Sequence, residues 1–328
     1  MPEAVFPRIT LILLTYNQRA YLKEAVSACL SQIGEPIEIL LSDDASTDGS
    51  FELMKQLADQ YSGPHLVRLR RNTCNLGIGE HYNQAIADSG GQLLVTAAGD
   101  DISLPGRVQT LAKAWDETGQ KADLIASHLI DMSLEGQDLG IIHAANLAKW
   151  PSPDAWVRKR PYVVGASHAF TKRLHTHFGL FSPDLAYEDQ VMALRACGLG
   201  GGVTVNEPLV RYRRGGISQR KNDALTPQGF LQWSLKKHTR QRALYSQIRQ
   251  DLQTLGRSDL WRGKVRRHLD RSTLALRLMS ASGLRQKLAL GLQPNGAGMV
   301  WSLRTVLYLT LPALGARIQA WQQHLKRQ

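Results

Sequence analysis

Polar and acidic side chains gather in short runs along the first two hundred residues of this 328-residue chain. The runs are Thr15-Tyr16-Asn17, Asp43-Asp44, Asn75-Leu76-Gly77, Asp100-Asp101 and Glu188-Asp189. Two carboxylates about 4 Å apart repel by about 4 kcal/mol at an effective dielectric near 20, so a cation or hydrogen-bond donors must lie between them. Paired carboxylates suit Mg²⁺ or Mn²⁺, which binds one or two protein oxygens and completes its shell with phosphate and water.

The elements around these runs explain how the runs could meet. Short apolar stretches at residues 8–14, 37–42, 65–70 and 92–97 predict strands, and periodic stretches at 19–32, 51–61 and 80–89 predict helices between them. This alternation is typical of a parallel sheet covered on both faces. Ligands of such sheets bind beyond the carboxyl ends of the strands, which is where the first four polar runs fall.

The second half of the chain is less regular. We expect a strand at 123–127, irregular structure at 131–160, a helix that opens near residue 186 and a last strand at 203–212. The chain contains no Gly-x-Gly-x-x-Gly after the first strand, no P-loop and no Gly-x-Ser-x-Gly, which disfavours dinucleotide-binding, P-loop and α/β-hydrolase chemistry. Its three cysteines form no Cys-x-x-Cys, so we expect neither a disulfide scaffold nor a cysteine zinc site, and a reducing cytoplasm.

The order and spacing of the five runs resemble those of family 2 glycosyltransferases, over about residues 7 to 220. The resemblance implies an α/β class of the GT-A type, the nucleotide-diphospho-sugar transferase fold, with a mostly parallel sheet between helices. It also implies an inverting, metal-dependent enzyme of hexosyltransferase type, which moves a sugar from a nucleotide-diphosphate donor to a hydroxyl acceptor. Bacterial cell-surface polysaccharide or lipid-linked oligosaccharide synthesis is the expected setting.

The resemblance also assigns roles to single residues. Asp44 would accept a hydrogen bond from the nucleobase, Asp100 would face the ribose or donor sugar, and Asp101 would bind Mn²⁺ or Mg²⁺. The remaining donor-side residues would line the nucleotide pocket: Thr15, Tyr16, Asn17, Asn75 and Gly77.

On the acceptor side, Asp189 would be the general base beside Glu188. A positioned carboxylate of this kind contributes about 10² to 10⁴ in rate.

Three positions depart from the family pattern. Ala98 stands where an acid often begins the metal motif, Ala45 replaces a frequent glycine, and Tyr212-Arg213-Arg214 lacks the histidine that often follows. Guanidinium groups suit phosphate oxygens, so we expect Arg213, or else Arg214, to bind the diphosphate instead.

Other interpretations remain open at this point. Asp43 and Ser46 could only cap a helix, Tyr16 could be a packing aromatic, and Glu188-Asp189 is a pair that any helix N-terminus favours. A nucleotidyltransferase would also need acidic metal ligands, although it usually has a glycine-rich basic loop that is absent here. A sugar-nucleotide-binding module without catalysis is the rival from another class.

The C-terminal third differs in charge from the rest. Residues 226–328 hold 18 basic and 3 acidic residues, whereas residues 1–225 hold 22 and 25. We therefore predict a catalytic domain at 1–225 and a basic amphipathic helical extension at 226–328. In the extension, Val265, Leu269, Thr273 and Leu276 should lie near one face.

No uncharged run reaches the roughly 18 to 20 residues that a spanning helix needs, and we expect no signal peptide. The predicted partner of the extension is an anionic membrane surface, with the enzyme peripheral on the inner face of the plasma membrane. A solvated basic cap on the catalytic domain is the alternative, and no motif supports nucleic-acid binding.

Overall fold

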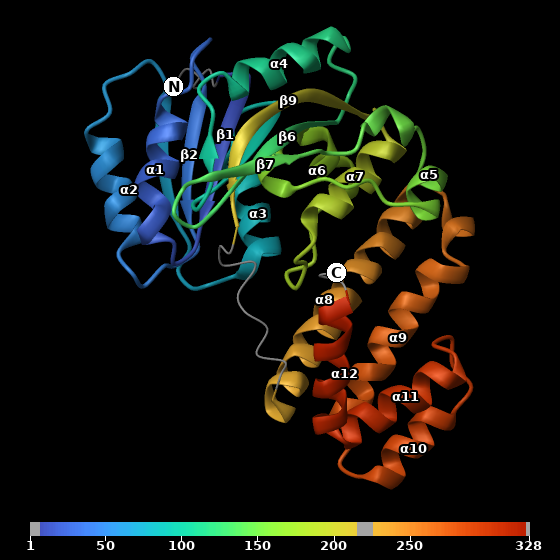
Figure 1. Cartoon of the computed structure of the whole chain (residues 1–328). Helices are drawn as coiled ribbons and strands as arrows, with labels where there is room; N and C mark the ends of the chain where they lie inside the picture. The colour runs from blue at the N-terminus through green and yellow to red at the C-terminus, as the bar shows by residue number, and fades with distance from the viewer. Residues whose placement is uncertain (1–6, 215–225, 326–328) are drawn as a thin grey trace. The chain divides into compact units, whose positions relative to one another are not determined.

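Figure 1 shows a computed structural model of the chain, which describes residues 7–214 and 226–325. The chain divides into two compact units, Met1–Gln219 and Arg220–Gln328. The predicted domain boundary after residue 225 lies at the end of the stretch 215–225, which is outside the described residues.

The first unit alternates strands and helices, as the sequence predicts for its first hundred residues. Its N-terminal half contains β1 (Ile9–Thr15), α1 (Arg19–Leu30), β2 (Glu38–Asp43), α2 (Ser50–Asp59), β3 (Leu66–Arg71), α3 (Gly77–Asp88), β4 (Leu93–Ala98), β5 (Ile102–Ser103) and α4 (Arg107–Glu117). Its C-terminal half contains β6 (Leu124–Met132), β7 (Asp138–Ile142), α5 (Pro153–Arg158), β8 (His168–Thr171), α6 (Lys172–Phe178), α7 (Glu188–Gly198) and β9 (Gly202–Arg213).

In the described part of the chain, nine strands form one sheet in the order β3-β2-β1-β4-β8-β6-β9-β5, with β7 paired to β6. β1, β2, β3 and β4 pair in parallel, which confirms the predicted first half. The second half is mixed rather than mostly parallel, because β8 runs antiparallel to both β4 and β6. β8 has only four residues, too few for periodicity to show its direction.

The stretch predicted to be irregular contains more structure than expected. β6 continues to Met132, and β7 pairs with it antiparallel. His128 and Asp131 interrupt the apolar pattern of this strand, so the sequence did not predict its full length. Leu129 and Met132 are nevertheless fully buried.

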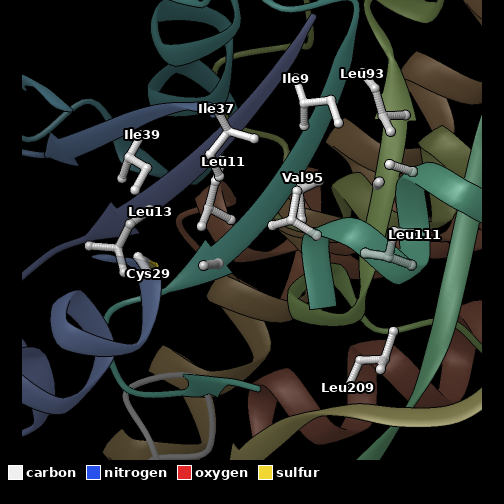
Figure 2. Packing of buried hydrophobic residues seen from close by; sticks show 14 of the residues in the cluster. Ile9, Leu11, Leu13, Cys29, Ile37, Ile39, Leu93, Val95, Leu111 and Leu209 are labelled. Atoms are coloured by element: carbon white, nitrogen blue, oxygen red, sulfur yellow. The ribbon is translucent and has the colours of Figure 1, made fainter. Parts of the chain in front are cut away.

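Two layers of helices cover the sheet. Alternate residues of the parallel strands, such as Leu11, Ile39 and Val95, pack with Cys29 of α1 and Leu111 of α4 in one apolar core (Figure 2). Burying each such side chain stabilises the fold by about 1.5–3 kcal/mol. This packing fixes the strands, so their carboxyl ends are held at defined positions.

The second unit is entirely helical in its described residues, as predicted. Its helices are α8 (Pro227–Thr254), α9 (Gly263–Ser280), α10 (Leu284–Leu292), α11 (Met299–Thr310) and α12 (Pro312–Leu325), coloured orange to red in Figure 1. A separate apolar core joins α8, α9, α11 and α12.

The predicted apolar face of α9 is only partly right. Val265 is buried, but Leu269 and Leu276 are only partly so and Thr273 is exposed. The inner face continues through Ala275 and Leu278. A helix in a bundle of this kind buries a wider stripe than one amphipathic face.

Among the described residues, a single helix with the length and apolar character to cross a membrane is not found. The pair Met299–Thr310 and Pro312–Gln322 meets that test only when taken together, and the two helices are bent by 113° at their junction.

Candidate active site

The carboxyl ends of three parallel strands lie side by side. Thr15 at the end of β1 pairs with Asp43 at the end of β2, and Leu14 pairs with Ala98 at the end of β4. Backbone hydrogen bonds extend the alignment into the loops: Asp44 N donates to Thr15 O at 3.0 Å, and Gly99 N donates to Leu14 O at 3.0 Å. Three of the predicted polar runs therefore share one edge of the sheet.

The loop after β1 is fixed to the loop after β2. Asn17 adopts a left-handed backbone conformation, with φ of 51°. Its backbone N donates to Ser46 Oγ at 2.8 Å, and its Oδ1 accepts from Thr47 N at 2.9 Å. The side chain of Thr15 is buried, whereas that of Tyr16 is 37% exposed. An exposed aromatic ring at this edge favours the pocket over simple packing for Tyr16.

Gly99 marks a close approach between β1 and β4. A Cβ atom at residue 99 would lie 2.6 Å from Thr15 Oγ1 and 2.7 Å from Gln18 Oε1. Only glycine fits there, so the turn that carries Asp100 and Asp101 packs directly against the Thr15 loop.

Asp44 is tied to the start of α3. Its Oδ1 accepts from Asn72 Nδ2 at 2.7 Å and from Leu76 N at 2.9 Å, and its Oδ2 accepts from Gly77 N at 3.0 Å. The carboxylate thereby satisfies backbone N–H groups that the helix itself leaves open. The predicted contact of Asp44 with a nucleobase stays a prediction, as do the pocket roles of Asn75, which is exposed, and Gly77.

Asp43 was not assigned a ligand role from the sequence, yet it is fully buried at the same edge. Its Oδ2 accepts from Ser46 N at 2.9 Å and lies 3.4 Å from Arg71 Nε. Its Oδ1 has no hydrogen-bond partner among the described residues. The alternative that Asp43 and Ser46 cap the next helix is wrong, because α2 begins after Gly49 and its Ser50 N is satisfied by Asp48.

Asp101 is a buried acid beside another acid. Its Oδ1 accepts from Arg213 N at 2.8 Å. Burial, and next the charge of Asp100, raise the pKa of Asp101 well above its usual range. A cation at this point would relieve both effects.

The described residues contain no group of three or more His, Cys, Asp and Glu side chains arranged to bind a metal. Mg²⁺ and Mn²⁺ sites that share the ion with a diphosphate need only one or two carboxylates. Asp100 and Asp101 fit that smaller set, and Ala98 offers no third ligand.

Arg213 is hydrogen-bonded to the turn that carries Asp100 and Asp101. Its Nε donates to Asp100 O at 3.0 Å, and its terminal nitrogens donate to Leu134 O at 2.9 Å and Glu24 Oε2 at 2.7 Å. The guanidinium also lies 4.5 Å from the ring centroid of Tyr21. Protein acceptors therefore engage all three guanidinium nitrogens. The predicted contact of Arg213 with a diphosphate stays a prediction.

Arg214 differs from Arg213 in exposure. Its side chain is 61% exposed, and its Nε donates to Asp131 Oδ1 at 2.7 Å.

Glu188 and Asp189 begin α7, and both are partly exposed. Burial raises the pKa of Asp189 to about 6, against the lowering effect of Gln190 N, which donates to its Oδ1 at 2.7 Å. Burial, and next the charge of Asp189, raise the pKa of Glu188 to about 8. A pair that served only to stabilise a helix N-terminus would have lowered pKa values. A carboxylate with a pKa near neutrality suits proton abstraction.

Two buried residues that the sequence did not single out connect the acidic groups. Tyr82 of α3 has a pKa raised well above its usual range by burial and by the nearby charges of Glu188 and Asp189, while its hydroxyl bonds to the Thr96 side chain. Burial lowers the pKa of Arg107 to about 10, against the charges of neighbours that include Asp101 and Tyr82.

Arg107 is fully buried and makes hydrogen bonds to three surrounding segments of the first unit. It donates to Ser103 Oγ at 2.8 Å, Thr96 O at 2.6 Å and Ala166 O at 2.7 Å. Arginine is rarely buried completely, so nothing in its sequence context signals this position.

Comparison with known proteins finds similarity over the N-terminal part of the first unit. Residues 10–141 match the family model described as glycosyl transferase family 2. The chain is 27% identical over 159 residues to the putative glycosyltransferase EpsE of Bacillus subtilis, covering 48% of this chain and 55% of the relative. It is 28% identical over 145 residues to the succinoglycan biosynthesis protein ExoO of Rhizobium meliloti, covering 44% and 40%. The chain thus matches about half or less of the length of these curated relatives.

Solved structures share the fold at low identity. S. aureus TarS 1-349 in complex with UDP-GlcNAc has a TM-score of 0.54 and 15% identity over 98% of this chain and 93% of that one. The mannosyltransferase PcManGT from Pyrobaculum calidifontis, in complex with GDP-Man and Mn²⁺, has a TM-score of 0.50 and 16% identity over 95% and 88%. The GT-A type of α/β fold is therefore confirmed. In sequence, residues 10–141 of this chain are similar to glycosyltransferase family 2.

Proposed function

We propose that this protein transfers a sugar from a nucleotide-diphosphate sugar to a hydroxyl acceptor, with inversion at the anomeric carbon. The observation that carries the proposal is Asp189, a carboxylate with a pKa of about 6. Asp189 is near Tyr82, Tyr82 is near Arg107, and Arg107 is near Asp101 of the sheet edge. The donor would lie across the ends of β1, β2 and β4, and the acceptor would approach from the side of α7.

The reaction follows from the order of these groups. The Asp189 carboxylate takes the proton of the acceptor hydroxyl as its oxygen forms a bond to the anomeric carbon. The bond from that carbon to the β-phosphate oxygen breaks on the opposite face, and the electron pair leaves with the nucleoside diphosphate. A divalent cation held by Asp101 and Asp100 would offset the charge that grows on the diphosphate. Glu188, with its pKa of about 8, would stay protonated at neutral pH and leave Asp189 as the single ionised base.

The similar proteins support the donor class and the setting. TarS and PcManGT were solved with UDP-GlcNAc and GDP-Man, both nucleoside diphosphate sugars, and PcManGT with Mn²⁺. ExoO is named for succinoglycan synthesis, a polysaccharide pathway. We therefore propose Mn²⁺ or Mg²⁺ as the cofactor and a cell-surface glycan or its lipid-linked precursor as the acceptor.

We also propose that the basic C-terminal extension holds the enzyme at the anionic inner face of the plasma membrane. A lipid-linked acceptor would be reached there, and no role in nucleic-acid binding is proposed.

A donor panel tests the proposed function. UDP, GDP, dTDP and CMP sugars are compared in thermal shift with and without Mn²⁺, and turnover of the best donor is then measured for Asp189→Asn. We expect metal-linked stabilisation by one nucleoside class, and a variant that binds donor normally but transfers about 10² to 10⁴ times more slowly. Asp59→Asn is the matched control, because Asp59 is exposed on α2. Normal transfer by Asp189→Asn would remove Asp189 as the base.

A further inference from the structure

The outer face of α10 carries three exposed leucines. Leu284, Leu288 and Leu292 are four residues apart, so they form one stripe along the helix. They are 53%, 38% and 54% exposed.

α11 has a buried face and, beside it, a stripe of exposed apolar side chains. Ser302, Val306 and Leu309 face the core of the unit and are buried. An exposed stripe beside this buried face carries Met299, Val300, Leu303 and Leu307, and Val300 is 83% exposed. A helix with a broad apolar surface normally buries that surface in apolar surroundings. Water does not provide such apolar surroundings for the exposed stripe of α11.

The charged side chains on α10, α11 and α12 are all basic among the described residues, while Asp270 of α9 lies beside Gly296 in the loop between α10 and α11. Residues 271–328 contain eight basic residues and no Asp or Glu. Arg285 on α10, Arg304 on α11 and Arg317 on α12 are all exposed. An apolar surface with a cationic border complements an anionic bilayer, in which phosphates lie just outside the hydrocarbon.

We propose that the exposed leucines of α10, together with Met299, Val300, Leu303 and Leu307 of α11, insert into the interface of an anionic bilayer. We call these residues the α10–α11 surface. The inference deepens the proposed membrane attachment and rests on it, but it does not depend on sugar transfer.

Length and charge favour this partner over others. α11 has 12 residues and is therefore about 18 Å long, which is too short to cross a hydrocarbon core of about 30 Å. A helix of this kind lies in the plane of the interface instead. A second copy of the chain would bring the same positive charge to the contact, whereas lipid phosphates neutralise it.

A vesicle-binding experiment on the full chain tests the inference. The triple variant Leu288→Gln, Val300→Gln, Leu307→Gln is compared with wild type on vesicles made of equal parts phosphatidylglycerol and phosphatidylcholine. We expect partition onto these vesicles to fall on the order of a hundredfold. The matched control is Ile33→Gln, Leu139→Gln, Ile141→Gln, which removes equally exposed apolar side chains of the first unit and should bind as wild type does.

Two results would overturn the inference. One is unchanged partition of the α10–α11 triple variant. The other is light scattering that shows a wild-type dimer which the triple variant cannot form, because the surface would then join two copies. Transfer to a water-soluble acceptor is measured in parallel. Its absence would count against the proposed enzyme activity and leave the vesicle result standing.

A depth probe tests insertion itself. Val300→Cys is labelled with a polarity-sensitive fluorophore in a Cys74→Ser background, because Cys74 is exposed and the other cysteines are buried. We expect a blue shift on anionic vesicles that remains at high salt, since salt screens the arginines but not apolar contact. The same label on Cys74 of the unaltered chain should show none, and a label at residue 300 without a shift would contradict insertion.

Discussion

The two units of this protein use charge in opposite ways. The first unit has nearly balanced charge over residues 1–225 and buries several ionised groups with partners, such as Glu38 with Arg68 and Asp123 with Arg173. The second unit has an excess of fifteen positive charges over residues 226–328 and leaves most of its basic side chains exposed.

The treatment of apolar surface differs as well. The first unit buries most of its large apolar side chains and exposes others, such as Ile33 and Ile141, on different elements, whereas α10 and α11 expose seven of them on two consecutive helices. The difference indicates a division of labour. A site that takes up a proton and stabilises a departing diphosphate needs a few charges held rigidly at low solvent exposure. A surface that meets lipid needs many charges and apolar groups free to contact it.

Among the substitutions that compare the two units, Asp101→Asn should have the largest effect. Asparagine keeps an oxygen that can accept from Arg213 N, so the turn should keep its fold while it loses its charge. Transfer should fall by roughly a hundredfold to a thousandfold, because several kcal/mol of charge stabilisation are lost. Metal-linked thermal stabilisation with donor should vanish in the same variant, while vesicle binding is unchanged.

A variant that kept its Mn²⁺-dependent shift in melting temperature would exclude Asp101 as a metal ligand. Asp59→Asn, which removes an exposed acid of the same unit, is the control for the loss of one negative charge.

The next effect concerns stability and comes from Arg107→Met. The variant removes the donors to Thr96 O, Ala166 O and Ser103 Oγ at a fully buried position. Each acceptor left without a partner costs about 1–3 kcal/mol, so we expect a loss of about 3 kcal/mol in the free energy of unfolding. Urea denaturation measures it.

The matched change in the second unit is Arg242→Met, at an exposed position of α8. Its effect should stay within about 0.5 kcal/mol. Equal losses at residues 107 and 242 would contradict the view that only the first unit depends on buried charge.

The sequence predicted the first half of the fold well for a physical reason. Apolar runs such as residues 9–14 are long and uninterrupted, because parallel strands are buried on both faces. The polar runs at their ends follow each strand closely, so the edge of the sheet and the acids that would line it could be foreseen. The pair at the start of α7 was predicted only through resemblance to a family.

The rest depended on tertiary contacts that no local pattern carries. The direction of β8 is set by its insertion between β4 and β6, and the burial of Arg107 is set by carbonyl groups up to 59 residues away in the sequence. The sequence could not show that Asp43, rather than Asp44, has an oxygen without a hydrogen-bond partner among the described residues, because the two are adjacent and of the same type. In the second unit, the orientation of α9 against the neighbouring helices determines which of its residues are buried.

A pH-dependent effect on stability is expected for Glu188→Gln. The carboxyl binds its proton in the folded state up to a pKa of about 8 but has a usual pKa of 4.5, so the folded chain holds more protons between these values. Wild type therefore loses stability as pH rises from about 4.5 through about 8, and glutamine does not. Melting temperatures at pH 5 and pH 9 measure this: the variant should gain on wild type at the higher pH.

The opposite sign, with the variant losing ground at pH 9, would mean that the folded state stabilises the ionised Glu188. Glu188 and Asp189 would then only stabilise the N-terminus of α7, as acidic residues commonly do. The first unit would then differ less from the second in its use of buried acids.

The smallest effect on stability is expected for Arg304→Gln, which tests the lipid-facing side of the comparison. Arg304 is exposed beside the exposed apolar stripe of α11, so its loss should change the free energy of unfolding by no more than about 0.5 kcal/mol. On anionic vesicles each arginine near the surface contributes about 1 kcal/mol, and partition should therefore fall about fivefold. On phosphatidylcholine alone the variant and wild type should bind equally, because there is no net surface charge to attract the guanidinium. A loss of stability as large as that of Arg107→Met would show instead that the second unit also needs its charges for folding, and the division of labour between the two units would not hold.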